Sequence, residues 1–144
     1  MSEQTRSKLL GDFGEYLLAW FLRSKFAIET SLVKSEGIDI LCRDNKGVLL
    51  PEKAIVAISV RTRERNDSNS RKPVDADWSA MEKASDAWGA IAYFAHVLVY
   101  PKDGSITLFL LPVSKARSYG KEFSVVKAEK ESSNIILKSK FEPY

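Results

Sequence analysis

The sequence predicts an α/β domain in which helices cover the faces of a β-sheet. Two observations support this fold class. The apolar residues of positions 7–25 recur at helical spacing, and the pattern then changes to that of several strands with one longer helix among them. The chain has 144 residues, 44% of them hydrophobic and 28% charged, which is an ordinary globular composition. We therefore expect a single domain over residues 1–144.

Residues 7–25 are expected to form the first helix, because apolar side chains recur there at spacings of three and four. The members of this face are Leu10, Phe13, Leu17, Trp20 and Phe21. Leu18 and Leu22 lie on the opposite flank, so the helix is apolar around most of its circumference. It is therefore expected to be deeply packed, with its tryptophan as an anchor of the core or of the helix flank.

Three strands are expected next, at residues 26–33, 38–42 and 54–65, separated by turns at 35–37 and 44–47. The third strand is the most informative, because polar and apolar residues alternate along it. One face carries Ala57, Ser59, Arg61 and Arg63, and the other carries Ile58, Val60 and Thr62. A polar loop at 66–73 is expected to follow.

The rest of the chain is expected to form a second helix, a hairpin and a few short elements. Helix 77–88 is predicted to begin at an N-cap aspartate, Asp75 or Asp77, and contains Trp78 and Trp88 as further anchors. Strands 91–100 and 106–111 are joined by a turn at 102–105. A short helix at 114–119 and strand-like segments at 123–126 and 134–137 complete the prediction.

The composition excludes several classes of protein. A single cysteine, Cys42, leaves no intramolecular disulfide and favours a reducing compartment. Together with a single histidine, His96, it excludes a zinc knuckle, and we expect both side chains to be packed in the interior. There is no apolar run long enough to span a bilayer, and the first residues lack the apolar segment of a signal peptide. We therefore expect a cytoplasmic protein without a membrane partner.

The distribution of charge favours a polyanionic partner. The net charge is +3, and residues 61–72 contain five basic side chains against Glu64 and Asp67. We expect this segment to contact the phosphates of a nucleic acid, DNA in the first place and RNA as the alternative. The residues concerned are Arg61, Arg63, Arg65, Arg71 and Lys72. The other interpretation of the same charges is a solvated loop.

Three polar side chains stand where the apolar pattern calls for hydrophobic ones. Glu15 lies in the first helix, where Gly11 is expected to leave room over its carboxylate, Asp39 lies in the second strand, and Arg61 lies in the third. A buried charge is costly unless it is paired or bound to a metal. We expect the three groups to converge in one polar centre, either as an ion network with a purely structural role or as a functional site.

The spacing of short motifs around these residues resembles that of the PD-(D/E)xK nuclease superfamily. The matching pieces are Gly11-Asp-Phe-Gly-Glu15, Gly37-Ile-Asp39 and Ile58-Ser-Val-Arg-Thr62. The resemblance covers roughly residues 7–100 and is nearest to the resolvase-like and restriction-endonuclease-like branches. It implies a mixed central β-sheet flanked by helices, that is, a restriction-endonuclease-like fold.

The resemblance also implies a divalent metal site for phosphodiester hydrolysis. A hard cation polarises the phosphate and activates a water, and magnesium takes carboxylate oxygens as ligands. Carried over to this chain, the motif positions of the catalytic centre are Glu15, Asp39, Ser59 and Arg61, with the two carboxylates as metal ligands.

The sequence departs from the motif at two of these positions. Ser59 stands in place of the second acid, and Arg61 stands in place of the lysine. Loss of one charge about 4 Å from a cation forfeits about 4 kcal/mol per unit of cation charge at an effective dielectric of about 20. We therefore expect Mg²⁺ to bind weakly, and we expect no other cofactor. Arginine binds phosphate in a bidentate manner but does not exchange a proton, which suits it to holding a phosphate.

Displaced residues offer a second interpretation of the site. Glu82 or Asp86 on the second helix could supply the missing acid, and Glu52 is a weaker candidate. Lys34 could replace the lost lysine from the neighbouring strand. The alternative for each is an exposed side chain without a role in the site.

Three hypotheses follow from the sequence. The leading one is a nucleic-acid-binding protein of nuclease-like fold with a degenerate, inactive metal site. The second is an active metal-dependent endonuclease that uses Glu15, Asp39 and Glu82 as metal ligands. The third is a non-catalytic accessory or oligomerising protein, in which the apolar strands at 91–111 pair across a homodimer interface.

Overall fold

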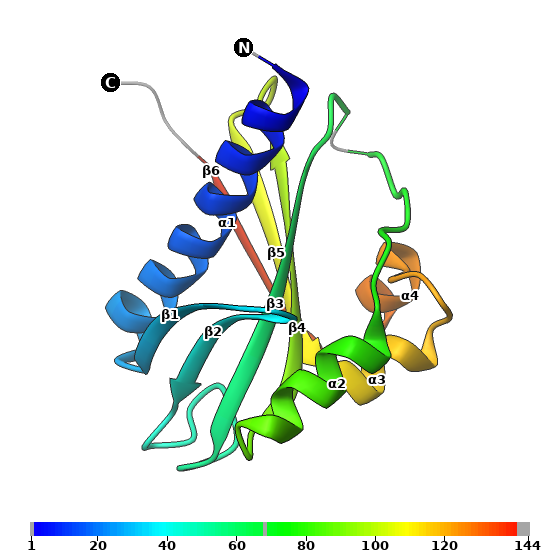
Figure 1. The fold of residues 1–144 in the computed structure, drawn as a ribbon. Coiled ribbons are helices and arrows are strands. Elements are labelled where there is room, and N and C mark those ends of the chain that lie inside the picture. Colours follow the sequence, from blue (N-terminus) through cyan, green and yellow to red (C-terminus); the bar gives the residue numbers. More distant parts are fainter. Residues whose placement is uncertain (1, 68, 141–144) are drawn as a thin grey trace.

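The computed structural model describes residues 2–67 and 69–140. Within this part of the chain four helices are present (Figure 1): α1 (Glu3–Phe26), α2 (Trp78–Ala87), α3 (Val113–Ser118) and α4 (Val125–Lys130). The strands are β1 (Glu29–Ser35), β2 (Ile38–Arg43), β3 (Ile55–Glu64), β4 (Ile91–Tyr100), β5 (Ser105–Pro112) and β6 (Ile135–Lys140).

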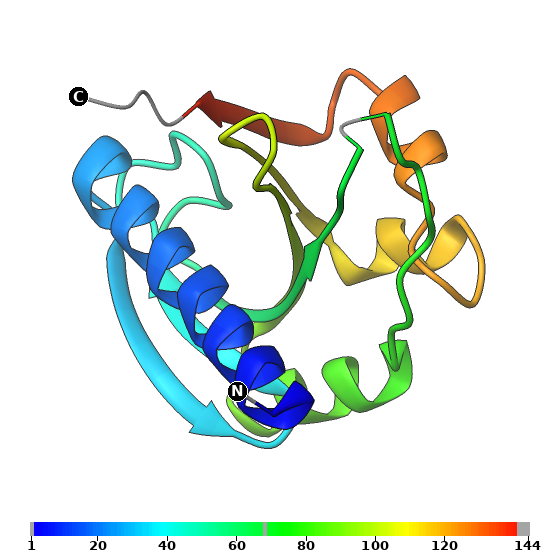
Figure 2. The same cartoon turned by 90° about the horizontal axis from the view of Figure 1, so that it is seen from above.

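The strands form one sheet in the order of the sequence, from β1 to β6. The pairing of β3 with β4 is parallel, with α2 in the connection between them, and every other pairing is antiparallel. Helix α1 lies on one side of the sheet, and α2, α3 and α4 lie on the other (Figure 1, Figure 2). This arrangement confirms the fold class expected from the sequence, a mixed central sheet flanked by helices.

Two hydrophobic clusters fill the space between the layers. The cluster under α1 joins Leu18 and Leu22 of the helix to Ile58 and Val60 of β3. The cluster on the other face joins Trp78 and Met81 of α2 to aromatic residues of β4 and β5. Because side chains alternate along a strand, β3 contributes its apolar residues to the α1 side and turns Ser59, Arg61 and Arg63 to the α2 side.

Cys42 and His96 are packed in the interior, as the sequence predicts. The His96 side chain has no exposed surface, and its Nδ1 lies 2.9 Å from the carbonyl oxygen of Arg61. Burial lowers the pKa of His96 to about 4, against the opposing effect of this hydrogen bond. The histidine is therefore a neutral core residue at physiological pH.

The expectation that α1 is deeply packed is wrong for half of its surface. Phe13 is 40% exposed and Trp20 is 56% exposed, and only Gly14, Leu18, Phe21 and Leu22 are buried. The helix rests on the sheet with this one face, and among the described residues no element covers its outer side. The tryptophan prediction holds for Trp78, which is 6% exposed, and fails for Trp20 and for Trp88, which is 47% exposed.

Two other sequence predictions are corrected by the structure. Residues 123–126 do not form a strand, because Ser124 caps α4 by accepting a hydrogen bond from the backbone N–H of Lys127, and Phe123 alone bridges to Val74. Strands β4 and β5 lie inside the sheet with both edges paired, so they cannot pair across a dimer interface. None of the helices in the described ranges is long and apolar enough to cross a membrane.

The approach of α1 to β3 generates a prediction about two glycines of the same helix. A Cβ at Gly14 would lie 1.9 Å from the Oγ1 of Thr62, whereas a Cβ at Gly11 meets nothing within 4 Å. We expect Gly14→Ala to lower the free energy of unfolding by about 2 kcal/mol or more, because the helix must move away from the strand. Gly11→Ala is the matched control and should raise stability by about 0.5–1 kcal/mol. Urea unfolding of the two variants checks this, and equal effects would contradict the close packing.

Candidate functional site

The site begins where β2 and β3 separate. Their backbone pairing includes Ile40 with Ile58. Beyond this pair, side chains bind the backbone groups that would otherwise be hydrogen-bonded between the two strands. Oδ2 of Asp39 accepts a hydrogen bond from the backbone N–H of Val60 at 2.7 Å, and the hydroxyl of Ser59 donates to the carbonyl oxygen of Gly37. The Asp39 carboxylate therefore lies in the gap between the two strands and holds them at this separation.

Gly37 allows α2 to close over this gap. It has a φ of 83°, and a Cβ there would lie 3.0 Å from the Cβ of Ala84 and 3.2 Å from the carbonyl oxygen of Ala80. Only glycine fits the turn both by conformation and by space. The Gly37-Ile-Asp39 piece of the sequence is thus a tight turn under α2 that directs the aspartate into the gap.

Glu15 reaches the same place from α1. The neighbouring Gly14 brings the helix backbone into contact with Thr62 of β3, and Glu15 is half-buried beside this contact. The approach at Gly14 therefore brings Glu15 close to the sheet, and a Cβ at Gly11 would meet nothing within 4 Å, so the space beside that residue is open.

The two carboxyl groups interact and one of them is protonated over part of the physiological range. Burial, the charge and hydrogen bonding of Asp39 and the charge of Asp12 together raise the pKa of Glu15 to about 7. Lys34 of β1 is the cation that acts in the opposite direction. The lysine that the sequence offered as a replacement for the motif lysine is therefore close enough to affect the pair.

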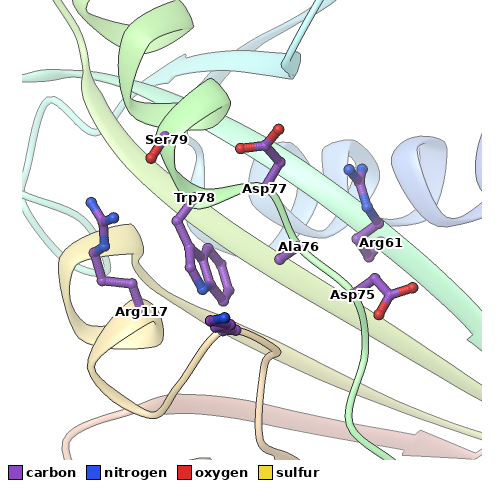
Figure 3. Close-up of a pocket in the computed structure, with 8 residues that line it drawn as sticks. Arg61, Asp75, Ala76, Asp77, Trp78, Ser79 and Arg117 are labelled. Atoms are coloured by element: carbon purple, nitrogen blue, oxygen red, sulfur yellow. The ribbon is translucent and has the colours of Figure 1, made fainter.

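Arg61 points to a different part of the site. Together with the segment leading into α2 and with Arg117 and Lys121 it lines an open cleft of about 580 Å³ on the α2 side of the sheet (Figure 3). Its guanidinium contacts the carbonyl oxygen of Val60 at 3.3 Å, and it forms no ion pair within the described ranges. The structure thus brings Glu15 and Asp39 together and turns the guanidinium toward the cleft.

Arg63 on β3 and Arg65, which directly follows the last residue of the strand, continue the line of Arg61. The three side chains occupy alternate positions and are half-buried, and each donates to the carbonyl oxygen of the residue before it. Burial and the charges of its two neighbours lower the pKa of Arg63, against the opposing charge of Asp75. We call Arg61, Arg63 and Arg65 the arginine row.

The other two predicted nucleic-acid contacts lie on the segment after β3. Both of these residues, Arg71 and Lys72, are exposed. The Nε of Arg71 forms an ion pair of 2.8 Å with Glu129 of α4. This pair fastens the segment to α4, and a phosphate would compete with Glu129 for the guanidinium.

The acids on α2 are not directed at the carboxyl pair. Ala80 and Ala84 form the face of α2 that meets Gly37, whereas Glu82 forms an ion pair with Arg117 of α3, and Asp86 is exposed. Glu52 is exposed in a bridge with Asp44. The ligand set of Asp39, Glu15 and Glu82 expected from the sequence is therefore not assembled.

The donor chemistry does not complete a magnesium site. Within residues 2–67 and 69–140 no three acidic, histidine or cysteine side chains are grouped closely enough to hold a metal ion. Ser59 is neutral and its hydroxyl proton is given to Gly37, and one oxygen of Asp39 is engaged by Val60. Magnesium is usually held by one or two carboxylates and several waters, and a proton on Glu15 must be released before its carboxylate can bind the ion.

Sequence reasoning missed the cleft beside α2. Asp77 was identified as an N-cap and does accept a hydrogen bond from the backbone N–H of Ala80 at 3.0 Å. Nothing in the sequence pattern placed Arg117 and Lys121 near β3, because α3 is distant from α2 along the chain and packs beside it only in the folded protein. The only signal was two basic residues, Arg117 within the short predicted helix at 114–119 and Lys121 just after it.

Comparison with solved structures shows a likeness to a Holliday junction resolvase. The structure of Hjc, a Holliday junction resolvase from the archaeal hyperthermophile Archaeoglobus fulgidus, has 18% sequence identity with this chain. The match covers 80% of this chain and 82% of that chain, with a TM-score of 0.49. No protein-family model matches the sequence, and no curated protein does.

The carboxyl pair generates a prediction about pH. A carboxyl group whose pKa rises on folding does not change the free energy of unfolding at a pH below its pKa in the unfolded chain. The ionised group destabilises the fold as the pH rises to its pKa in the folded chain, which is about 7 here. Glu15→Gln should therefore leave stability unchanged near pH 4.5 and raise it above pH 7, by about 1 kcal/mol after allowance for solvent screening of a partly exposed group. Urea unfolding at the two pH values measures the difference.

Asp39→Ala is the control for this experiment. It removes the acceptor of the Val60 N–H, so it should lower stability at both pH values by about 1–3 kcal/mol. A Glu15→Gln variant whose stability parallels that of the wild type at every pH would show that the carboxyl groups do not interact.

Proposed function

We propose that this protein binds double-stranded DNA through the arginine row of β3 and does not cut it. The observation that carries the proposal is the row itself: three arginines at alternate positions, two on β3 and one directly after it, without an acidic ion-pair partner among the described residues. Exposed cations are normally interspersed with acids, and an unneutralised line of them attracts a polyanion.

The chemistry of the row suits phosphate. Guanidinium groups present paired N–H donors that match phosphate oxygens, and their weak hydration makes them cheap to desolvate. The lowered pKa of Arg63 reflects burial and the repulsion between neighbouring charges, and a bound phosphate relieves that repulsion. Lys72 and Arg71 extend the same contact on the segment after β3, as the sequence predicts.

The absence of cleavage follows from how the motif residues are engaged. Hydrolysis of a phosphodiester needs a cation held by anionic oxygens. In this chain Ser59 and Asp39 hold the separation of β2 and β3, and burial and the neighbouring Asp39 raise the pKa of Glu15 to about 7. The proposed protein therefore has the nuclease-like fold and contacts phosphates, but it does not use a metal ion to hydrolyse them.

The binding proposal predicts how affinity changes when the row is shortened. Arg61→Ala and Arg63→Ala should each weaken binding to a labelled DNA duplex about fivefold to tenfold, because each removes one charge-assisted contact. Each should also reduce the slope of log affinity against log salt by about 1, measured by fluorescence anisotropy between about 50 mM and about 200 mM salt.

Arg43→Ala is the matched control, because Arg43 is an exposed arginine at the opposite end of β2, across from Ile55 at the start of β3. It loses the same charge and should change affinity little. Unchanged affinity in the two row variants would refute the proposed surface. If no duplex binds at low salt, the accessory role expected as an alternative from the sequence remains, and an RNA duplex of the same sequence tests the other nucleic acid.

An active endonuclease is the second candidate function, and one observation favours it. Glu15, Asp39 and Lys34 bring two carboxyl groups and a lysine into one neighbourhood, which are the residue types that the nuclease motif requires. Our proposal predicts that supercoiled, linear and branched DNA remain intact with the wild-type protein in Mg²⁺ or Mn²⁺. Cleavage that disappears in Asp39→Ala would overturn the inactive assignment in favour of the endonuclease.

A further inference from the structure

The cleft beside α2 has two walls that the fold joins at two points. One wall is the segment that enters α2, and the other is the segment that leaves α3. Val74 and Phe123 connect them with two backbone hydrogen bonds, of 3.1 Å and 2.8 Å. Four residues further along the first wall, the indole N–H of Trp78 donates to the carbonyl oxygen of Gly120 at 3.0 Å. Both walls are therefore held in place by the fold, and the cleft between them is part of the structure.

Three cations line this cleft, and they come from three parts of the chain. Arg61 belongs to β3, Arg117 to α3, and Lys121 to the segment after α3. In Figure 3 the two arginines lie on either side of Trp78. Arg117 is paired with Glu82, whereas Arg61 and Lys121 form no ion pair with any described residue. Two positive charges without an acidic partner thus line one cleft, which attracts an anion.

The cleft also contains acidic side chains, which narrow the class of ligand. Asp77 is partly engaged, because its Oδ1 accepts a hydrogen bond from the backbone N–H of Ala80 at 3.0 Å. Asp75 is exposed, and its charge acts on Arg63 of the arginine row. A carboxylate only accepts hydrogen bonds, and it repels a ligand that is anionic throughout. The cleft therefore suits a molecule that has an anion at one end and N–H or O–H donors at the other.

We propose that the cleft binds a nucleoside monophosphate unit, either at the phosphorylated end of a nucleic-acid strand or as a free nucleotide. The phosphate monoester carries a charge of about −1.5 to −2 at pH 7, which matches the charges of Arg61 and Lys121. The sugar hydroxyl and base amino groups supply donors for Asp75. The cleft volume of about 580 Å³ lies within the range of roughly 300–1,000 Å³ that is typical of small-molecule sites, so a bare phosphate would leave most of it empty.

The charge of the ligand distinguishes this site from the arginine row. A phosphate inside a strand is a diester with a single negative charge, whereas a strand end or a free nucleotide can carry the doubly charged monoester. Arg61 belongs to both the row and the cleft, so a strand whose end lies in the cleft would continue along the row. Binding of a strand end rests on the proposed function, and binding of a free nucleotide does not.

Calorimetric titration of the full chain with deoxyadenosine 5′-monophosphate tests the site without DNA. We expect affinity to fall by about tenfold or more in Lys121→Ala, and when deoxyadenosine, which lacks the phosphate, replaces the nucleotide. Lys121 is exposed, so its substitution should leave the thermal unfolding midpoint nearly unchanged. Lys46→Ala, at an exposed lysine in the turn after β2, is the matched control and should bind like the wild type.

DNA molecules of one duplex sequence test binding of a strand end. Two are hairpins with a phosphate on the 5′ or the 3′ terminus, one is the same hairpin with hydroxyl termini, and one is a closed dumbbell, which measures the row alone. By fluorescence anisotropy we expect a phosphorylated hairpin to bind about fivefold to tenfold tighter than the hydroxyl hairpin and the dumbbell. This preference should be lost in Lys121→Ala and kept in Lys46→Ala.

An effect of the phosphate that disappears in Lys121→Ala supports the proposal. Such an effect with a hairpin identifies a strand end as the ligand, and with the mononucleotide alone it identifies a free nucleotide. The proposal is overturned if the phosphate changes affinity in neither experiment, or if its effect is the same in Lys121→Ala as in the wild type. A dumbbell that does not bind would contradict the proposed function instead, and the titration with the mononucleotide would then decide this proposal.

Discussion

The separation of β2 and β3 beyond Ile40 and Ile58 is the constraint on which the site depends. Two strands that part inside a sheet leave backbone groups without partners, and a buried N–H or carbonyl without a partner is costly. Here Asp39 and Ser59 provide the missing partners. The side chains at these two positions of the motif-like pattern therefore hold β2 and β3 together, and α2 closes over them because Gly37 leaves it room.

This use of the motif residues divides the site into two parts with different chemistry. On one side Glu15 and Asp39 lie close together, burial and Asp39 raise the pKa of Glu15, and Lys34 is the nearby cation. On the other, Arg61 opens the arginine row and faces the cleft beside α2. A hydrolytic centre needs its carboxylates, its cation and its phosphate ligand at one point, whereas binding of a phosphate chain needs only an accessible line of cations. The observed division suits binding.

Helix α1 connects these features to the rest of the molecule. Its inner face approaches β3 so closely that Gly14 has no room for a side chain, and this approach carries Glu15 to Asp39. Its outer face carries aromatic side chains that no described element covers. One helix thus positions the carboxyl pair and presents a separate surface on the opposite side of the molecule from the arginine row.

The sequence by itself determined the elements whose signals are local. Periodicity identified α1, β3 and α2, and the motif spacing singled out Glu15 and Asp39, because these patterns depend on neighbours along the chain. Only the tertiary structure decided which face of α1 is buried, since Phe13 and Trp20 are as apolar as Leu18, and the sheet selects one face. It also decided that Arg61 lines the cleft beside α2 and that Glu82 meets Arg117. These outcomes depend on which element packs opposite each side chain, and the pattern of one chain does not contain that information.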